Sequence, residues 1–408
     1  PMADFAIQGR PLAPPLYGVM TLSPGAMQGL VTVTLGYVLA HRGFTAAEIG
    51  VLIGLFLLPA AMRFVTGPLL DLVLGPRAWA LLSILASSIC ALILAVTPLT
   101  RTAMPLLAAD VFALGVVGNV LYTALGAALA VTTPNRQRGA VAAWMSSGFI
   151  GGIGLGGGLG LWLAAHAGGL GNAALTLAAL TLLCATPLVR LRVPPVAGRA
   201  QFRAHMAGVW AAAADLARTR AGVLAAIVVT LPVGLGAAAN LLPAVADDWR
   251  ASADLVAAVT GVFGGLIAAP GAILGGYLSD RFPRRAFFLA AALAYGAAEA
   301  AMAFAPHTPL AFAIFVPLGA FLLGTPTAAC NTVMFERLGA EGAATVVAIL
   351  GSLANLPVSV MTAFVGYVET AHGATAMLAA EAGVGVVAAV AYVLLAWLWR
   401  PSPTLAHV

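Results

Sequence analysis

Long apolar segments separated by short polar connections run along almost the whole chain. Each segment is close to the roughly 20 residues that an α-helix needs to cross a bilayer. The segments cover residues 15–40, 49–70, 79–98, 105–131, 141–165, 173–189, 223–246, 255–278, 286–305, 310–335, 344–368 and 376–399. The pattern therefore predicts an all-α membrane protein with twelve transmembrane helices.

The composition excludes a soluble protein. Of the 408 residues, 62% are hydrophobic and 8% are charged, and the mean hydropathy is +1.02, whereas soluble domains carry roughly 25% charged residues. The 46 glycines and 25 prolines are tolerated in packed membrane helices, where neighbouring groups satisfy the freed backbone. We expect no cofactor, and we read Cys90, Cys184 and Cys330 as packing residues within spans.

The arginines orient the chain. All nineteen basic residues are arginine; fifteen fall at the termini and the even-numbered connections, three (Arg42, Arg101 and Arg250) fall on the opposite side, and Arg63 lies within a span. Cytoplasmic loops carry the excess of basic residues, so we predict that both termini are cytoplasmic. This topology explains the net charge of +5 without a nucleic-acid partner.

The longest polar connection divides the chain. Residues 190–220 hold six of the arginines and begin with the segment VPPVAG. Within them, apolar residues recur at helical spacing against Arg203, Asp215 and Arg218, which favours a short helix on the cytoplasmic membrane surface over a disordered linker. The apolar residues are Phe202, Met206, Val209, Trp210 and Leu216. We predict a six-helix bundle over 1–191, a linker over 192–220 and a second six-helix bundle over 221–408.

Two pairs of similar segments indicate that the halves are repeats. GPLLDLVLGPR (67–77) and GGYLSDRFPRR (275–285) place Asp71 and Asp280 209 residues apart, close to the half-length of 204. The segments SPG (23–25) and LPVG (231–234) also interrupt the first and seventh spans at similar depth. Interrupted helices in corresponding positions of two repeats point to a binding region near the bilayer midplane.

These connections resemble the G-x-L-x-D-R-x-G-R-[RK] loop of the major facilitator superfamily. The second copy matches well, whereas the first has Leu72 at the arginine position. The resemblance implies the major facilitator fold of two six-helix pseudo-repeats and a gate in these loops. The gating residues that it implies are Asp71, Arg77, Asp280, Arg281, Arg284 and Arg285.

A narrower resemblance rests on three segments. RFVTGPLLD (63–71), GFIGGIGLGGGLG (148–160) and ATVVAILGSLANLP (344–357) resemble the branch of muropeptide permeases, acetyl-coenzyme A transporters and related siderophore importers. That branch implies a muropeptide, a siderophore or an acyl-coenzyme A-like molecule as the solute. The chain departs from it in helix four, where Asn119 and Thr123 replace two acidic residues, so substrate and coupling do not transfer with the resemblance.

Ionisable residues inside the spans are the candidates for coupling, because such residues are expensive in a membrane and mark functional pathways. Arg63 lies about 12 Å along the helix axis from Asp71; it either snorkels to the interface, pairs with a carboxylate in gating, or attracts an anionic substrate. Asp110 on the fourth span is the candidate for a protonated coupling site, the alternative being a wetted helix-start residue. Glu299 and Glu381 are read as hydrogen-bond partners within one bundle.

Polar side chains on the spans supply the candidates for solute binding. Some of them will only join helices, as Asn and Thr often do. The candidates are Gln28, Thr32, Asn119, Tyr122, Asn240, Thr325, Asn331 and Asn355.

The function that these features favour is secondary transport. We expect a monomer in the bacterial inner membrane that moves an organic solute by alternating access, with import and symport with a proton as the leading form. Exporters of drugs or metabolites, and assembly or receptor proteins that kept the fold, are the alternatives. A P-loop is absent from the sequence, and the histidines fall in connections, tails or span ends, so we predict neither ATP-driven transport nor an enzyme.

Overall fold

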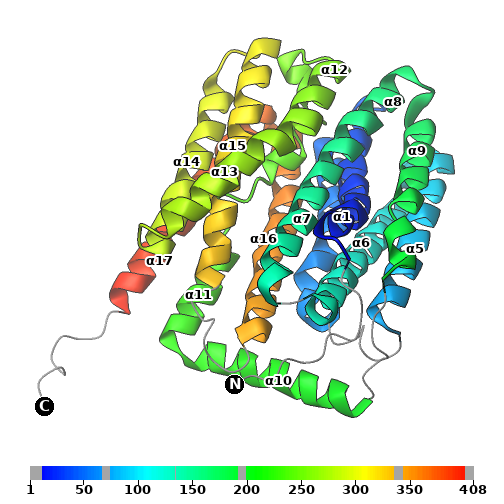
Figure 1. The fold of residues 1–408 in the computed structure, drawn as a ribbon. Coiled ribbons are helices and arrows are strands. Elements are labelled where there is room, and N and C mark those ends of the chain that lie inside the picture. The colour runs from blue at the N-terminus through cyan, green and yellow to red at the C-terminus, as the bar shows by residue number, and fades with distance from the viewer. Residues whose placement is uncertain (1–11, 67–73, 134, 192–198, 335–342, 400–408) are drawn as a thin grey trace, which may run out of the picture.

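The protein is a bundle of long helices arranged in two groups. The computed structural model describes residues 12–66, 74–133, 135–191, 199–334 and 343–399, and all regular secondary structure in these ranges is helical. The amino-terminal and carboxy-terminal groups stand side by side, with their helices roughly parallel to a common axis (Figure 1). We call them the amino-terminal and carboxy-terminal bundles.

The amino-terminal bundle comprises α1 (Pro14–Gly29), η1 (Leu30–Leu35), α2 (Gly36–Ala40), α3 (Ala46–Leu57), η2 (Leu58–Met62), α5 (Pro76–Val96), η3 (Arg101–Ala103), α6 (Met104–Thr132), α7 (Asn135–Gly154), η4 (Leu155–Leu159), α8 (Gly160–His166), α9 (Gly169–Leu183) and η5 (Thr186–Val189). The connecting helix is α10 (Arg199–Arg218). The carboxy-terminal bundle comprises α11 (Arg220–Thr230), η6 (Ala238–Asn240), η7 (Ala246–Trp249), α12 (Ala253–Val256), η8 (Ala257–Val262), α13 (Phe263–Ser279), α14 (Arg284–Phe304), α15 (Pro309–Met334), α16 (Ala343–His372) and α17 (Ala374–Leu398).

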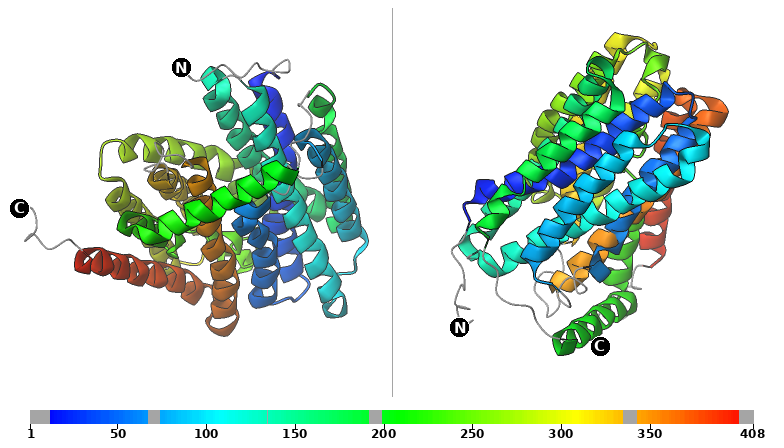
Figure 2. Two further views of the ribbon diagram at one scale, coloured as in Figure 1. Left: turned by 90° about the horizontal axis from the view of Figure 1, so that it is seen from below. Right: turned by 90° about the vertical axis from the view of Figure 1, so that its right-hand side faces the viewer.

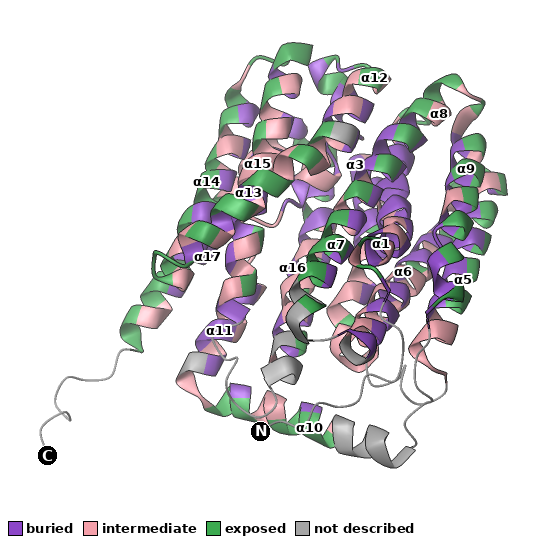
Figure 3. Cartoon of the chain, in the orientation of Figure 1, coloured by how far each residue is buried: buried purple, intermediate pink, exposed green. Residues whose placement is uncertain are grey.

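Eleven helices in the described ranges are long and apolar enough to cross a membrane. They match eleven of the twelve predicted spans, most of them to within a few residues at each end. Their outward faces carry large apolar side chains such as Leu266, Val387 and Leu398, each more than 60% exposed, and Figure 3 shows exposed residues on the outer faces of both bundles. Such faces are stable in lipid, because the bilayer interior is itself apolar. The chain is a multi-pass membrane protein.

The predicted seventh span differs, because it is not one continuous helix. Helix α11 ends at Thr230, and the chain then passes through Gly234 and Gly236 at φ 62° and 69°. That left-handed backbone ends an α-helix and suits glycine. The break occurs at the segment LPVG, where the sequence predicts an interruption.

The prediction of a matching break in the first span is wrong. Helix α1 continues through Pro24 and is followed directly by η1 and α2. Proline removes only one backbone hydrogen bond from a helix, which membrane helices tolerate when neighbours pack around it. Here Pro24 and Gly25 are buried, and the Gly25 Cα lies so near α7 that an added Cβ would meet the Phe149 carbonyl oxygen at 2.1 Å.

Helix α10 runs across one end of both bundles, roughly perpendicular to the spans (Figure 2). It occupies the predicted linker, whose residues 192–198 lie outside the described ranges. Val209 and Leu216 are buried against the carboxy-terminal bundle, whereas Trp210 is 69% exposed. Val209 and Leu216 therefore lie on a protein-packed face of α10, and Trp210 lies on an exposed face.

The two bundles touch along α3 and α16. The Ser359 hydroxyl donates to the Gly54 carbonyl at 2.6 Å, and the Phe64 amide donates to the Ser352 hydroxyl at 3.1 Å. A Cβ on Gly366 would lie 2.4 Å from the Ala46 carbonyl oxygen. Small residues thus let the two backbones approach closely, as is common between membrane helices.

The end of the molecule away from α10 carries further contacts between the bundles. His41 lies 3.3 Å from Asp247, and His166 lies 3.6 Å from Asp254. Between these ion pairs and the centre, η4 packs on η8, where a Cβ on Gly261 would lie 2.4 Å from the Gly158 Cα. The bundles are therefore held together at the end opposite α10.

Candidate functional site

A cavity of about 780 Å³ lies between the two bundles. Its volume is within the range of small-molecule sites. The amino-terminal bundle lines it with Arg63, Phe64, Tyr122, Thr123, Gly126 and Ala127. The remaining lining comes from α10, the broken seventh span, Phe288, α15 and α16, and includes Val209, Val229, Val233, Gly234, Leu235, Thr327, Cys330, Asn331, Met334, Gly351 and Asn355.

Arg63 is the charged side chain of this lining. It follows the tight helical turn η2, which begins next to Pro59. Its Nε donates to the Asn119 Oδ1 at 2.7 Å, and its guanidinium carbon lies 5.2 Å from the centre of the Tyr122 ring. No acidic side chain of the described residues pairs with Arg63, while Asp71 lies outside those residues. The guanidinium is therefore held at one edge and over an aromatic face, and its other N–H groups have no hydrogen-bond partner among the described residues.

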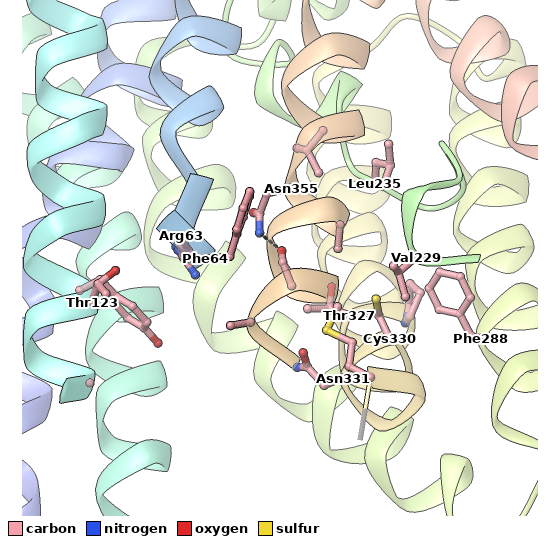
Figure 4. A pocket seen from close by; sticks show the side chains of 18 of the residues that line it. Arg63, Phe64, Thr123, Val229, Leu235, Phe288, Thr327, Cys330, Asn331 and Asn355 are labelled. Atoms are coloured by element: carbon pink, nitrogen blue, oxygen red, sulfur yellow. Dashed lines mark hydrogen bonds between the residues drawn. The ribbon is translucent and has the colours of Figure 1, made fainter. Parts of the chain in front are cut away.

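Polar and apolar groups of the carboxy-terminal bundle face Arg63 across the cavity. Figure 4 shows Thr327, Cys330 and Asn331 on the side opposite Arg63 and Thr123. The Asn355 Nδ2 donates to the Gly351 carbonyl at 2.7 Å, which leaves its side-chain oxygen as an acceptor. The cavity thus has a cationic wall, an amide-bearing wall and apolar surface between them.

The structure brings five of the eight predicted solute-binding residues to this region. Tyr122, Asn331 and Asn355 line the cavity. Gln28 and Asn119, again with Tyr122, line a small adjoining hollow of about 40 Å³ that also touches Arg63.

The other three predicted solute-binding residues form contacts elsewhere. The Thr32 hydroxyl donates to the Gln28 carbonyl at 2.9 Å, and the Asn240 Nδ2 donates to the Thr362 hydroxyl at 3.3 Å. The Thr325 hydroxyl donates to the Leu322 carbonyl at 2.7 Å. None of the three lines the central cavity.

The candidate acidic residues all lie away from the cavity. Asp110 is 6% exposed and interacts with Cys90 on α5, so it faces the interior of the amino-terminal bundle. Its Oδ2 has no hydrogen-bond partner among the described residues. Glu299 and Glu381 are buried together inside the carboxy-terminal bundle.

Most of the predicted gating residues lie at the ends of helices. Arg77 donates to the Val189 carbonyl at 3.4 Å, and the Arg281 guanidinium carbon lies 4.2 Å from the centre of the Tyr277 ring. Asp280 is exposed, and Arg284 and Arg285 begin α14. Asp71 falls outside the described residues.

Several lining residues carry no signal that sequence reasoning would use. Cys330 reads as a packing residue, yet it lines the cavity together with Thr327. Both lie on the helix that carries Asn331, so the helical spacing i, i+3 and i+4 from Thr327 would have grouped them. Phe288 and Val209 come from elements that do not face the predicted midplane site, and only the fold brings them there.

A second hollow of similar volume, about 820 Å³, lies between α7 and α13. Its lining is mostly glycine, alanine and large apolar residues, with Ser147 and Asp254 as its polar members. A binding site needs convergent polar groups for orientation and specificity, and the central cavity supplies them. We therefore take the central cavity as the candidate site.

Comparison with known proteins agrees with this architecture. The sequence matches the family model described as the Major Facilitator Superfamily twice, over residues 18–235 and 222–408. The first match runs from the amino-terminal bundle through α10 and α11, the second covers the carboxy-terminal bundle, and together they cover nearly the whole chain. No curated protein matches the sequence.

Solved structures of transporters share the fold. A nucleoside transporter, NupG, is 14% identical with a TM-score of 0.70, over 93% of this chain and 98% of its own. The D-xylose–proton symporter is 16% identical with a TM-score of 0.70, over 95% and 97% of the two chains. A bacterial homologue of the human lysosomal transporter Spinster, in an inward-facing and occupied conformation, is 17% identical with a TM-score of 0.70, over 95% and 97%.

Proposed function

Because the chain belongs to the major facilitator superfamily, we propose that it is a secondary transporter whose central cavity binds an organic solute with an acidic group. The observation that carries this proposal is Arg63, a cation in the cavity wall whose only hydrogen-bond partner among the described residues is the neutral Asn119. Arginine recognises carboxylates and phosphates through paired N–H groups. An intramembrane cation of this kind needs a compensating charge, which the solute would supply.

The rest of the lining favours a solute that is also partly apolar. Phe64, Phe288, Met334 and Val233 contribute apolar surface to the same cavity. Burial of matching solute surface would add about 25 cal/mol per Å². Asn331 and Asn355 would then orient polar groups at the far end. Muropeptide, siderophore and acyl-coenzyme A-like molecules all combine these features, and they remain the candidate classes.

The contacts between the bundles support alternating access. The end opposite α10 is joined by two histidine–aspartate contacts and by the close packing of η4 on η8, while the cavity extends to Val209 of α10. If the arginine-rich α10 side is cytoplasmic, this is a state open toward the cytoplasm. We propose import across a bacterial inner membrane in this orientation, with export as the alternative direction.

Site-specific labelling tests the transport cycle without knowledge of the solute. Leu235→Cys, in a background without the native cysteines, places one thiol in the cavity, and an impermeant maleimide is applied from either side of oriented vesicles. A transporter exposes this cysteine to both sides over time. Cross-linking the pair His41→Cys and Asp247→Cys should restrict labelling to the α10 side. Labelling from one side only, with or without the cross-link, would contradict alternating access and favour a receptor or assembly protein.

The acidic solute is tested with matched probes. We expect 4-phenylbutyrate to slow alkylation of Cys330 in the purified protein more than its neutral amide does. Arg63→Gln should remove this preference, Arg63→Lys should retain part of it, and Arg42→Gln, which removes an arginine outside the cavity, should leave it unchanged. Equal protection by acid and amide in the unmodified protein would refute an anion site at Arg63, whatever the fate of the variants.

A further inference from the structure

The Glu381 side chain caps the backbone at the break in the seventh span. Its Oε1 accepts a hydrogen bond from the Ala237 amide at 3.0 Å, and its Oε2 accepts one from the Ala238 amide. These amides begin η6, directly after the two glycines in left-handed conformation. An N–H group freed by a helix break inside a membrane is costly unless it finds a partner. The Glu381 carboxylate is therefore the cap that makes this break stable.

The second buried glutamate of this bundle, Glu299, lies beside Glu381. Its side chain is 6% exposed, and neither carboxyl oxygen has a hydrogen-bond partner among the described residues. The groups that interact with it are Glu381 and Tyr295, which is one turn earlier on α14. It also lines a small cavity of about 130 Å³. Within the part of the chain that the structure describes, this buried carboxyl faces a second carboxyl and forms no ion pair with a positively charged side chain.

We propose that Glu299 and Glu381 together bind one proton, and that loss of this proton loosens the capped break and moves the wall of the central cavity. Two neighbouring carboxyl groups in a low-dielectric interior cannot both be charged without strong repulsion. Glu381 accepts two N–H bonds, which stabilise its charge, so the proton belongs on Glu299 in the structure described here. The proton is then a ligand of the carboxy-terminal bundle, bound outside the solute cavity.

The connection to the cavity is short. Val233, Gly234 and Leu235 line the central cavity, and the amides that Glu381 accepts from follow two and three residues after Leu235. When Glu299 loses its proton, repulsion acts on the Glu381 carboxylate and weakens its hold on these amides. Gly234 and Gly236, whose φ angles are positive, then allow this part of the cavity wall to adopt another backbone conformation. Proton binding and cavity shape are coupled through one turn of chain.

The residues packed around Glu299 indicate that the two glutamates are the groups that titrate in this region. The small cavity is lined by Thr260 of η8 and by apolar residues of α15, and neither element contributes a titratable side chain to it. Tyr295 is its other ionisable neighbour. The volume of about 130 Å³ has room for a few waters, each of which takes roughly 30 Å³ in the liquid. Such waters would carry the proton to and from Glu299.

Infrared spectroscopy of the reconstituted full chain tests the proton site directly. A protonated carboxyl has a C=O stretching band separate from that of a carboxylate. We expect a pH-difference spectrum to contain a band of a buried carboxylic acid that Glu299→Gln removes. Glu369→Gln, a substitution of an acidic residue at the outer end of α16, should leave the band in place.

Labelling of Leu235→Cys as a function of pH tests the coupling. Because the thiolate is the reactive form, the rate is divided by that of free cysteine at the same pH. We expect this relative rate to change about fivefold or more between the protonated and deprotonated forms, the lower end of typical coupling between sites. Glu299→Gln should flatten this dependence, because glutamine mimics the protonated acid. Glu381→Gln should make labelling fast at all pH values, because one amide of the break loses its acceptor.

Three results would overturn the inference, and the unmodified protein alone can give the first. A carboxylic-acid band that does not respond to pH would mean a permanently neutral Glu299 with a structural role. A band that Asp110→Asn removes instead would place the proton in the amino-terminal bundle. A labelling rate that stays in constant proportion to that of free cysteine at every pH, together with a titrating band, would separate the proton from the cavity wall. None of these results bears on solute binding at Arg63.

Discussion

The pairing of Arg63 with Asn119 sets the charge of the cavity. An arginine bound to a neutral amide stays available to an anion, whereas an arginine bound to a carboxylate is already neutralised. The neutral amide of Asn119 thus determines what the cavity is able to bind, because an aspartate at this position would pair with Arg63. The 2.7 Å bond from Nε keeps the guanidinium in place without cancelling its charge.

Asn119→Asp should therefore weaken binding of an acidic solute. The new carboxylate would pair with Arg63 and compete with the solute, and we expect a loss of about tenfold or more in affinity, equivalent to ~1.4 kcal/mol. Protection of Cys330 by 4-phenylbutyrate measures it. Asn331→Asp is the matched control, because it adds the same charge to the cavity without a contact to Arg63, and its effect should be smaller. An unchanged affinity in Asn119→Asp would show that Arg63 does not hold the anion.

Close contacts at glycine residues determine how the helices pack against one another. In the segment 148–160, the glycines at 148, 152 and 156 face α1, and those at 154 and 158 face η8 of the other bundle. The fifth span therefore packs on two partners with two different faces. This double contact is a physical reason for so many glycines in one helix, since each glycine otherwise destabilises a helix by up to ~1 kcal/mol relative to alanine.

Gly152→Ala should destabilise the protein, whereas its neighbour Gly151→Ala should not. A Cβ on Gly152 would meet the Leu22 carbonyl oxygen at 2.3 Å, and a Cβ on Gly151 would only contact the Leu22 side chain at 3.7 Å. Overpacking of this kind costs about 1–3 kcal/mol. Thermal unfolding of the two purified variants gives the comparison. Equal melting temperatures would mean that α1 and α7 separate more easily than their packing indicates.

The whole molecule is held in one conformation by contacts at the end opposite α10. Some of these contacts are weak, because the His41–Asp247 and His166–Asp254 contacts are exposed. Even with a protonated histidine, such pairs contribute about 1 kcal/mol or less. The packing of η4 on η8 has no such flexibility, because backbone meets backbone. We infer that the glycine contact, more than the ion pairs, decides whether this end closes.

Gly261→Ala should shift the molecule toward the form that is open at this end. The added Cβ would lie 2.4 Å from the Gly158 Cα and 2.5 Å from its amide nitrogen, and the partner lies in the other bundle, so each bundle still folds. Electron–electron distance measurements between spin labels at Arg42 and Arg250 should show longer separations. Gly276→Ala, whose Cβ meets nothing within 4 Å, is the control and should reproduce the distances of the unmodified protein.

Much of the architecture is readable from the sequence, because the length of a span responds to the bilayer itself. The break at LPVG is readable for the same reason, since two glycines near a proline rarely continue a helix. The continuity of α1 through Pro24 is not readable, because it depends on how α7 packs against that turn. Likewise Asn331 and Asn240 look equivalent in the sequence, yet one lines the cavity and the other bonds to Thr362. The direction of a polar side chain on a membrane helix depends on neighbours that only the fold supplies.

Helix α10 links the two bundles along the chain, but it packs against the carboxy-terminal bundle. Val209 and Leu216 are part of the carboxy-terminal core, and Val209 also reaches the central cavity. The gene should therefore tolerate division into two separately translated pieces before residue 199, with α10 retained on the second piece, and the pieces should assemble when expressed together. Division after residue 218 would instead leave the second piece without two of its core side chains and the cavity without part of its wall. For this protein, the connector is a folding element of its carboxy-terminal half.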